Sequence, residues 1–579
     1  MPAKALMIQG VASNVGKSVL ATALCRIFAQ DGYRVAPFKA WNMALNSYVT
    51  RDGLEIGRAQ GVQAEAAGVE ATADMNPFLL KPKGNMTSQV IMRGRPWADV
   101  DAGEGRRDFV NVALPVIEES LGRLRTQFDI IVIEGAGSPA EINLRDRDVA
   151  NMRVAKMANA PVLLVADIDR GGALAAIVGT LTLLPEDERG LVAGSVLNKF
   201  RGDFEILRPG IEILERRTGK PVVGVVPYID ESLIDEEDSV SIERPASLEA
   251  MAAAAGGAAV APGAGPAAAV AAAAAAAGIE IAVIRLPHIS NFTDFDALAR
   301  EPGVRVRYIR PGESLEGIAS GGGFGPDAII IPGTKNTISD LRYLREAGYA
   351  AEIIERVRRG AQVMGICGGY QMLGRVLRDP YHTEAGTAGT GGGNGGGNGC
   401  GDDGGAPDEV PGLGLLPTET TFYPGKRTIR VRGRVIARAG WLGELAGQEI
   451  SGYEIHMGRT TLLGDAVPVF QVQDEVPTLT TTASNGDRVN DSSDAGFEGA
   501  VSPDGLVMGT YLHGVFDNDG FRRAFINHLR RKKGLSPLSM MEGTSSRALR
   551  ELNFDKLAAL VRRGLNMDAI YGLIGVRKG

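Results

Sequence analysis

A cysteine in a glycine-rich segment is the residue of this sequence best suited to chemistry. Cys367 follows the short apolar run 361–366, and Gly368 and Gly369 come directly after it, where a helical pattern begins. Small neighbours let a chain bend sharply, so that a side chain at such an elbow stands clear of the backbone. The start of a helix also favours the thiolate over the thiol. We therefore interpret Cys367 as a nucleophile, and a structural cysteine on a glycine turn is the alternative.

The whole elbow, 364–374, resembles that of the class I glutamine amidotransferases. The resemblance implies that Cys367 attacks the side-chain amide of glutamine, releases ammonia and forms a thioester that water clears. Among five histidines, His513 at the end of the apolar run 507–516 has the neighbourhood expected of the base. It would take the thiol proton and later protonate ammonia; a satisfied core histidine is the alternative. The related enzymes carry a glutamate two residues further on, where this chain has Val515, so the group that orients His513 is left open.

A tight loop at 332–336, directly after a predicted strand, contributes to the same site. In the similar amidotransferases such a loop donates a backbone N–H to the oxyanion of the intermediate, and the residue after the nucleophile donates another. By resemblance these groups are the peptides of Gly333 and Gly368, and an ordinary turn is the alternative. Glu454 and His456 are polar residues of a neighbouring segment to which we assign no catalytic role.

A glycine loop near the start of the chain predicts nucleotide binding. A strand at 5–9 leads into this loop, and a helix at 19–30 follows it. Backbone N–H groups of such a loop cradle phosphates, while its lysine reaches the terminal phosphates and its last hydroxyl can hold Mg²⁺. The predicted nucleotide-binding residues of the loop are Gly10, Ser13, Gly16, Lys17 and Ser18. The loop has one residue more between its glycines than the common form, and so resembles dethiobiotin synthetase, which phosphorylates a carboxylate.

Strands and helices alternate along both halves of the chain. Further strands are predicted at 33–39, 128–133, 161–166, 191–197 and 221–227, and in the second half at 279–286, 304–309, 328–331 and 362–366. This alternation predicts an α/β protein whose N-terminal phosphate-loop domain is a doubly wound, mostly parallel sheet. The amidotransferase resemblance implies an α/β fold for the second half. Glu134 follows its strand beside the phosphate loop, where a carboxylate is well placed for Mg²⁺; a solvated loop glutamate is the alternative.

Cations near the phosphate loop are candidate ligands for an acidic substrate. Lys39 ends a predicted strand, and Lys81 and Arg93 belong to a basic region of an otherwise acidic chain. Such groups can bind carboxylates or a polyanion, although scattered surface cations give the same pattern. We interpret these three residues as substrate ligands.

Three segments together carry a closer resemblance. The segments 37–47, 76–83 and 287–296 are similar to those of the cobyric acid synthase family, the glutamine-dependent amidases of the cobalamin pathway. The resemblance extends from about residue 5 to 519 outside three biased stretches, and Trp41 stands where the family usually has glutamine. It implies ATP and Mg²⁺, and amidation of the b, d, e and g side-chain carboxylates of adenosylcobyrinic acid a,c-diamide through acyl phosphates. It also implies that Lys39 meets the activated carboxylate and that Asn198 lies near the adenine.

Composition sets the broad class. The chain has 579 residues, 44% of them hydrophobic, with a net charge of -7, which argues against a nucleic-acid partner. The three cysteines show neither metal spacing nor a disulfide framework, so we expect a reducing cytoplasm. We expect no signal peptide at the N-terminus, and no membrane span in the alanine tract, which is too weakly hydrophobic. The oligomeric state is left open.

The expected domain boundaries follow changes in composition. We predict an ATP-binding amide synthetase domain at 1–245, an Ala/Gly-rich linker at 246–278, an amidotransferase domain at 279–535 and a C-terminal helical tail at 536–579. The stretches 383–406, which holds Cys400, and 478–498 are expected to be low-complexity insertions without a packed core. The tail is expected to dock on the second domain.

Two other functions compete with this interpretation. A cobyrinic acid a,c-diamide synthase is the nearer one, and the segments 37–47 and 287–296 argue against it. A partitioning-type ATPase that uses a similar nucleotide fold as a switch is the more distant one. It would leave Cys367 and His513 without a task.

Overall fold

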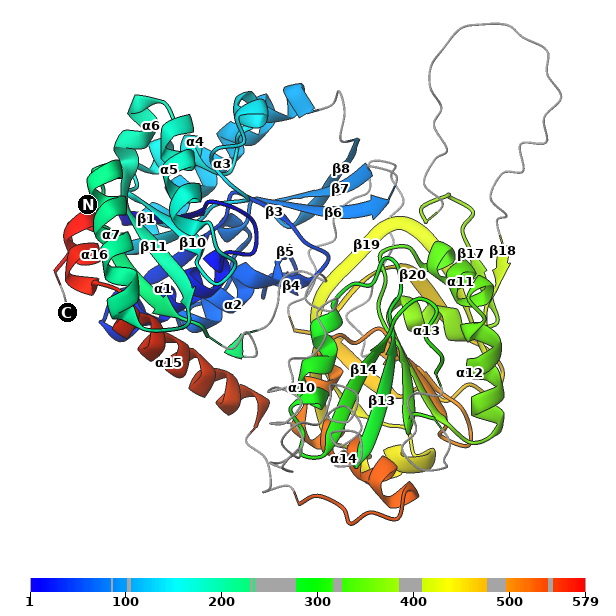
Figure 1. Ribbon diagram of the computed structural model, residues 1–579. Coiled ribbons are helices and arrows are strands. Elements are labelled where there is room, and N and C mark those ends of the chain that lie inside the picture. The colour runs from blue at the N-terminus through cyan, green and yellow to red at the C-terminus, as the bar shows by residue number, and fades with distance from the viewer. Residues whose placement is uncertain are drawn as a thin grey trace, which may run out of the picture. The chain divides into compact units, whose positions relative to one another are not determined.

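The computed structural model describes residues 2–84, 87–101, 106–229, 233–234, 278–315, 325–384, 409–475, 496–539 and 545–577. The chain forms two compact units: Met1–Asp238 with Arg547–Gly579, and Ser239–Ser546 (Figure 1). In the described part of the chain, none of the helices has both the length and the apolar composition that a membrane span requires.

A six-stranded parallel sheet with the order β12-β11-β10-β1-β9-β2 forms the centre of the first unit. Its strands are β1 (Lys4–Gly10), β2 (Val35–Phe38), β9 (Ile130–Glu134), β10 (Val162–Asp167), β11 (Val192–Phe200) and β12 (Val222–Pro227). β9 and β10 consist of buried residues throughout, as expected for parallel strands covered on both faces. Because β1 and β9 are neighbours, the loop after β1 and Glu134 at the end of β9 lie at the same edge of the sheet.

Helices cover both faces of this sheet (Figure 1). They include α1 (Lys17–Gln30), α2 (Arg58–Ala66), α3 (Arg106–Gln127), α5 (Ala173–Leu183) and α7 (Phe204–Thr218). Side chains alternate along β1, so that Leu6 and Ile8 enter the apolar cluster that contains α1, whereas Ala5 and Met7 enter the cluster that contains α3. The predicted doubly wound phosphate-loop fold is confirmed.

Two smaller sheets of the first unit were not predicted. One has the order β3-β6-β7-β8, and the other pairs β4 with β5. Their strands are β3 (Trp41–Met43), β4 (Ser47–Val49), β5 (Glu55–Gly57), β6 (Phe78–Gly84), β7 (Thr87–Met92) and β8 (Arg95–Asp101). They carry the segments that the sequence singled out around Lys81 and Arg93.

The prediction that the C-terminal tail docks on the second domain is wrong. Helices α15 (Ser546–Gly564) and α16 (Met567–Ile574) belong to the first unit, apart from the first residue of α15, and lie beside α1 (Figure 1). Leu557 and Val561 share an apolar cluster with residues of α1, and the ring of Tyr571 packs edge-on against Phe28 with centroids 5.6 Å apart. These helices were assigned to the nearer domain in sequence, whereas the apolar surface that they cover lies on α1.

The second unit also contains an α/β sheet, with the order β14-β13-β15-β16-β24-β23. Its strands are β13 (Ile279–Ile284), β14 (Val304–Ile309), β15 (Ala328–Ile331), β16 (Gln362–Ile366), β23 (Ala500–Val501) and β24 (Val507–Thr510), and β23 alone runs antiparallel to its neighbour. Helices α11 (Thr337–Glu346), α12 (Tyr349–Arg358), α13 (Gly368–Leu373) and α14 (Asp519–Lys532) connect or flank these strands. The predicted α/β amidotransferase fold is confirmed.

A further sheet of this unit is dominated by two long antiparallel strands, β19 (Thr418–Val435) and β20 (Glu449–Leu462). The smaller strands of this sheet are β17 (Val376–Arg378), β18 (Glu409–Pro411), β21 (Phe470–Asp474) and β22 (Gly496–Glu498). β20 matters for the site described below, because Tyr453 forms an isolated bridge with His513.

The predicted insertions begin or end inside folded structure. Thr383 and Glu384 are bonded to the carboxylate of Asp379, and Glu384 also accepts the backbone N–H of Thr337. At the second insertion, Gly496–Glu498 forms β22 and pairs with β21. These five residues were therefore assigned to insertions wrongly. Of the predicted linker 246–278, residues 246–277 lie outside the described residues, and so do the remaining stretches 385–406, which holds Cys400, and 478–495.

Candidate active sites

The phosphate loop joins β1 to α1 in the first unit. Gly16 has φ 95°, a left-handed conformation that glycine adopts readily, and a Cβ atom there would lie 2.1 Å from Nδ2 of Asn198. Lys17 curls back over the loop, where its Nζ donates to the carbonyl oxygens of Ala12 at 3.0 Å and Gly137 at 3.3 Å. The sequence therefore places a lysine ammonium and a helix N-terminus in one loop, as phosphate binding requires.

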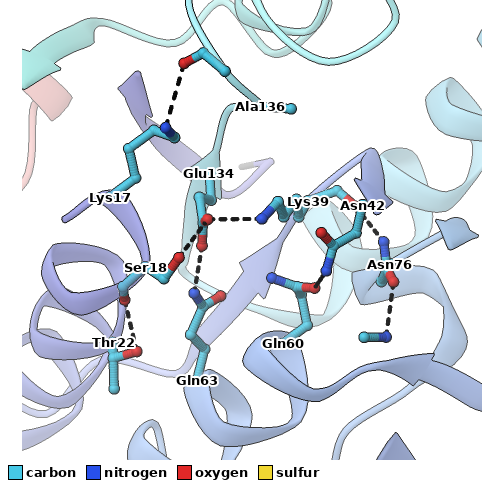
Figure 2. Close-up of polar contacts among 12 residues, drawn as sticks. Lys17, Ser18, Thr22, Lys39, Asn42, Gln60, Gln63, Asn76, Glu134 and Ala136 are labelled. Atoms are coloured by element: carbon cyan, nitrogen blue, oxygen red, sulfur yellow. Dashed lines mark hydrogen bonds and ion pairs between the residues drawn. The ribbon is translucent and has the colours of Figure 1, made fainter. Parts of the chain in front are cut away.

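Glu134 is the hub of this edge of the sheet (Figure 2). Its carboxylate accepts hydrogen bonds from Oγ of Ser18 at 2.8 Å, Nζ of Lys39 at 2.9 Å and Nε2 of Gln63 at 2.6 Å. Burial alone would raise the pKa of Glu134, but the Lys39 ammonium and the bonds from Gln63 and Ser18 outweigh it and lower the pKa. The carboxylate is therefore ionised, and it links the phosphate loop to β2 and α2.

The contact between Ser18 and Glu134 has the chemistry of a magnesium site. A hydroxyl and an ionised carboxylate are the oxygen ligands that Mg²⁺ uses together with the phosphates of a nucleotide. Among the described residues, no cluster of three or more His, Cys, Asp or Glu side chains suits a metal ion. The residues present therefore fit a Mg²⁺ ion that is held largely by its nucleotide.

The other predicted nucleotide and substrate ligands lie in different surroundings. Asn198, at the end of β11, donates from Nδ2 to the carbonyl of Val15 at 2.8 Å, so that it buttresses the phosphate loop. Ser13 is exposed in that loop. Gly10 lies under the lysine, because a Cβ atom there would lie 3.0 Å from Nζ of Lys17. Lys39 is the residue whose ammonium donates to Glu134.

Lys81 and Arg93 both have protein partners. Lys81 is 3% exposed, and its Nζ lies 2.8 Å from Glu55 and 2.7 Å from Oγ of Ser47. Arg93 is a non-glycine residue with φ 46°, and its guanidinium pairs with Glu119 on α3. Neither cation is on Glu134, so the structure does not bring the three predicted substrate ligands together on one carboxylate.

Trp41 has a packing role. Its ring packs edge-on against Phe109 with centroids 4.9 Å apart and lies 6.2 Å from Phe78. At this position the ring contributes apolar area to the cluster that contains α3.

In the second unit, Cys367 stands on a strained elbow between β16 and α13. Its φ of 52° and ψ of -109° are unusual for a residue with a side chain, and such strain concentrates at functional sites. A Cβ atom at Gly365 would lie 2.6 Å from the backbone of Gly369, so the bend needs small residues on both sides. The thiol is 6% exposed, and its Sγ lies 3.4 Å from the carbonyl oxygen of Ile455.

His513 is fully buried, and an aspartate holds one nitrogen of its ring. Nδ1 lies 2.7 Å from Oδ2 of Asp294, and Nε2 lies 3.2 Å from Nδ2 of Asn291. Burial lowers the pKa of His513, but the charge and hydrogen bond of Asp294, with a contribution from Cys367, raise it to about 10. The ring is therefore protonated at neutral pH, and a cation beside a cysteine stabilises the thiolate.

The two predicted oxyanion peptides lie close to these side chains. A Cβ atom at Gly333 would lie 3.1 Å from Cε1 of His513. One at Gly368 would lie 2.5 Å from Cγ2 and 3.2 Å from the backbone nitrogen of Thr334. The loop after β15 and the elbow therefore touch, and only glycines permit the contact. Asn336 ends this loop by capping α11, since its side chain accepts the N–H of Ser339.

A polar network lies next to the elbow. Gln371, one turn after the cysteine, accepts from Oγ1 of Thr337 at 2.9 Å and donates to the hydroxyl of Tyr511 at 3.2 Å. The ring of Tyr511 stacks on His456 with centroids 3.7 Å apart. Burial raises the pKa of Glu454, but its bonds to His456 and Arg427 bring it down to about 2. His456 and Glu454 therefore form a hydrogen-bonded support on β20.

Comparisons with known proteins cover both units. The family model for the CobQ/CobB/MinD/ParA nucleotide binding domain matches residues 6–240, and that for the CobB/CobQ-like glutamine amidotransferase domain matches residues 280–521. A protein from Pelotomaculum thermopropionicum named cobyric acid synthase is 50% identical over 99% of this chain and 97% of its own. The chain belongs to the cobyric acid synthase family. Proteins of the same name from Desulforamulus reducens and Moorella thermoacetica are each 47% identical over all of this chain, and over 99% and 98% of their own.

Membership of the cobyric acid synthase family fixes the coarse activity. The chain is a glutamine-dependent, amide-forming ligase of the cobalamin pathway, with a nucleotide-binding domain and a glutamine amidotransferase domain. The family resemblance inferred from the sequence is confirmed.

Sequence reasoning did not single out three residues that lie at these candidate sites of the cobyric acid synthase fold. Asp294 lies in the segment 287–296 that carried the family resemblance, but nothing in its spacing connects it with His513. Gln60 and Gln63 stand three positions apart on α2, so that they share one helix face, which was the available signal.

Proposed function

We propose that this chain amidates the b, d, e and g side-chain carboxylates of adenosylcobyrinic acid a,c-diamide and so forms adenosylcobyric acid, with the use of ATP and glutamine. The observation that carries the proposal is the contact of both Ser18 and Lys39 with Glu134. It supports the proposal because a hydroxyl suited to magnesium and a cation suited to a substrate carboxylate meet on one carboxylate beside the phosphate loop. Amide synthesis through an acyl phosphate needs that combination.

In the synthetase unit, the phosphate loop binds ATP and Lys17 reaches its terminal phosphates. Ser18 and Glu134 would hold Mg²⁺, which would supply charge neutralisation for the phosphates of the nucleotide. Lys39 moves from Glu134 to the incoming substrate carboxylate and holds it in line with the γ-phosphorus. Phosphoryl transfer depends chiefly on this positioning and charge neutralisation.

In this proposal, Lys81 and Arg93 do not contact the carboxylate that reacts. The corrinoid carries several carboxylates, and only one at a time can meet Lys39. Lys81, in its ion pair with Glu55, keeps the small sheets in place beside α2. Arg93 is available to other carboxylates of the substrate at the cost of its half-exposed pair with Glu119. Asn198 lies beside the adenine.

In the amidotransferase unit, Cys367 attacks the amide carbon of glutamine as a thiolate. The peptides of Gly333 and Gly368 donate to the oxyanion, and the proton on His513 goes to the departing ammonia. Asp294 keeps Nδ1 protonated and Nε2 directed at the reaction. Water then hydrolyses the thioester, and ammonia is used by the synthetase unit.

Mass spectrometry of the corrinoid after incubation with ATP and glutamine tests the proposal. Successive gains of amide groups on adenosylcobyrinic acid a,c-diamide are the expected result. Amidation of cobyrinic acid at its a and c side chains alone would favour the diamide synthase instead. ATP hydrolysis without glutamine hydrolysis would favour a switch ATPase. The cytoplasmic location expected from the sequence stays a prediction.

A further inference from the structure

In each of two buried glutamines of α2, only one of the two polar side-chain atoms has a hydrogen-bond partner among the described residues. Gln63 donates from Nε2 to Glu134, while its Oε1 has no hydrogen-bond partner among the described residues. Gln60 accepts at Oε1 from Nδ2 of Asn42 at 3.0 Å, while its Nε2 likewise has none there. Both side chains are 0% exposed. A buried polar atom without a partner bears its full desolvation penalty, so such a pair indicates groups that arrive from outside.

The carboxylate of Glu134 determines which end of Gln63 is open, while Gln60 directs its oxygen to Asn42. Glu134 also accepts from Ser18 and Lys39, so it is an ionised acceptor and Gln63 must present its nitrogen to it. The oxygen of Gln63 is thereby left over. In Figure 2 this oxygen and the amide nitrogen of Gln60 point toward one another below the ammonium of Lys39. The open ends are therefore one acceptor and one donor on the same side of the site.

This pairing discriminates between ligand groups. A carboxylate or a phosphate offers only acceptors, which would suit Gln60 but would be repelled by the oxygen of Gln63. Ammonia offers N–H donors, and the adduct of ammonia with an acyl group offers an oxygen acceptor together with N–H donors. The open donor and acceptor thus match the two heavy atoms, oxygen and nitrogen, that flank the carbon of the amide being made.

We infer that Gln60 and Gln63 bind the reacting atoms of amide formation: Nε2 of Gln60 holds the acyl oxygen, and Oε1 of Gln63 holds the incoming ammonia. The inference rests on the acyl phosphate of the proposed function and assigns the groups that act after it forms. The link from Gln63 to Glu134 then places the ammonia beside the carboxylate that organises the phosphate end of the site.

The step balances as a simple acyl transfer. The lone pair of ammonia forms the C–N bond, and the π electrons of the acyl C=O move to the oxygen held by Gln60. The C–O bond to phosphate breaks when the C=O bond re-forms, and phosphate leaves with the electron pair. One proton passes from nitrogen to the departing phosphate, which becomes hydrogen phosphate. Gln60 acts like an oxyanion donor, and such a donor contributes mainly to the transition state.

Two assays on the full-length enzyme with ammonium salt as nitrogen source separate this step from the one before it. The first measures amide formation on the corrinoid. The second follows ¹⁸O moving from the β–γ bridge of ATP to the non-bridging β positions, with corrinoid present and ammonia absent. This exchange reports reversible acyl phosphate formation and also shows that the first unit is folded.

Gln60→Met keeps the size of the side chain and removes the donor. We expect its ammonia-dependent kcat to fall roughly 100-fold, because one oxyanion donor is lost, while the exchange stays within about threefold of wild type. Gln60→Glu keeps the acceptor for Asn42 and should give the same pattern. Gln63→Met should raise the KM for ammonia. Gln362→Met is the matched control, since Gln362 is a buried glutamine of the second unit whose oxygen has no hydrogen-bond partner in the described part of the chain.

The outcomes are distinct. Amide formation by Gln60→Met within about threefold of wild type overturns the inference, because the donor would then be dispensable. A parallel loss of exchange and amide formation overturns it too and assigns Gln60 to the fold of the site. If wild type shows no exchange with corrinoid, the acyl phosphate itself is refuted, and the proposed function fails before the inference is reached.

Discussion

Oδ2 of Asp294 lies 2.7 Å from Nδ1 of His513, although 219 positions separate the two residues in the chain. The other carboxylate oxygen accepts the backbone N–H of Gly514 at 3.0 Å. The aspartate therefore binds both the ring and the backbone of the strand end that carries it. We propose that this carboxylate is the group that orients His513, which the sequence left open.

Replacing Asp294 with Asn should lower glutamine-dependent synthesis by roughly 10²- to 10⁴-fold, because the ring loses its fixed tautomer and its counter-charge. Ammonia-dependent synthesis should stay near wild type. Glutamine hydrolysis and ammonia-dependent amidation, measured on the same preparation, check both statements. Asp296→Asn, in the same segment, is the control. Unchanged glutamine use by the Asp294 variant would contradict the assignment.

The same variant should change the pH profile of glutamine hydrolysis. Asp294 raises the pKa of His513 to about 10 against the effect of burial, so the imidazolium form persists in wild type until the pH approaches that value. Without the carboxylate, burial lowers the pKa of the ring, and the alkaline limb of the profile should move to lower pH. A limb that stays in place would show that another group controls it.

Cys367→Ala should lose glutamine-dependent synthesis by orders of magnitude, because the thioester cannot form. Its synthesis with ammonium salt, at a pH that raises the NH₃ fraction, should be retained, since the synthetase residues lie in the other unit. Cys400→Ala serves as the control for loss of a thiol. His513→Ala should show the same pattern in a milder form. Joint loss of both activities would contradict separable sites.

Lys17→Ala should reduce amidation with either nitrogen source by at least roughly 100-fold, because the cation that neutralises the transferred phosphoryl group is gone. Glutamine hydrolysis at Cys367 should remain measurable. Lys83→Ala is a suitable control, since Lys83 forms a partly exposed pair with Asp99 and such pairs contribute little. Near-normal ammonia-dependent synthesis by the Lys17 variant would refute the phosphate-loop assignment.

Glu498 should make the second unit less stable as the pH rises. Burial, with the nearby charge of Glu454, raises the pKa of Glu498 to about 8 in the fold. In the unfolded chain a glutamate titrates near pH ~4.3, so the folded state binds the extra proton between these values. Stability is therefore full below the lower value and decreases toward pH 8, by an amount on the order of a few kcal/mol.

Glu498→Gln should flatten this dependence, because the amide can replace the protonated acid beside Thr510 and Tyr511. Hydrogen exchange of peptides from 496–516 in urea between pH 5 and 9 measures the effect locally. Glu449→Gln, at an exposed position of β20, is the control. An equally steep dependence in the Glu498 variant would show that other groups cause it.

Deletion of 385–406, bridged by about six Gly and Ser residues, should change both activities by less than about twofold, because loop length affects closure entropy only weakly. A longer deletion from Thr383 should be more harmful. It removes the carboxylate of Glu384, which accepts the backbone N–H of Thr337 at the start of α11. It also removes the hydrogen bond from Thr383 to Asp379. Steady-state assays of both deletions test the contrast, and equal behaviour would contradict it.

The sequence predicted the central sheets well because their strands are continuous apolar runs. β15 spans the predicted residues 328–331, and β16 spans the predicted residues 362–366. The proximity of Ser18 and Glu134 was also predictable, since the carboxyl ends of neighbouring parallel strands meet at one edge. The roles of these residues stay predictions.

Contacts between distant segments could not be predicted from local pattern. The basic region around Lys81 suggested a substrate ligand, but its ion pair with Glu55, which lies in a separate small sheet, left no signal in the sequence. Asp294 was missed for the same reason, since its carboxylate acquires meaning only when the η5 segment, Phe292–Phe295, is packed against the strand end that carries His513. The packing of α15 and α16 could not be predicted either, because the apolar surface that they cover belongs to α1, near the other end of the chain.

That last arrangement has a consequence for biosynthesis. The residues of α15 and α16 complete an apolar cluster with residues of β1 and α1, so the first unit is discontinuous in sequence and the second unit is inserted within it. While the ribosome is still making the second unit, Leu24 and Phe28 of α1 lack their final partners. The part that begins synthesis first is therefore completed last, and a fragment ending at residue 245 would lack part of its own core.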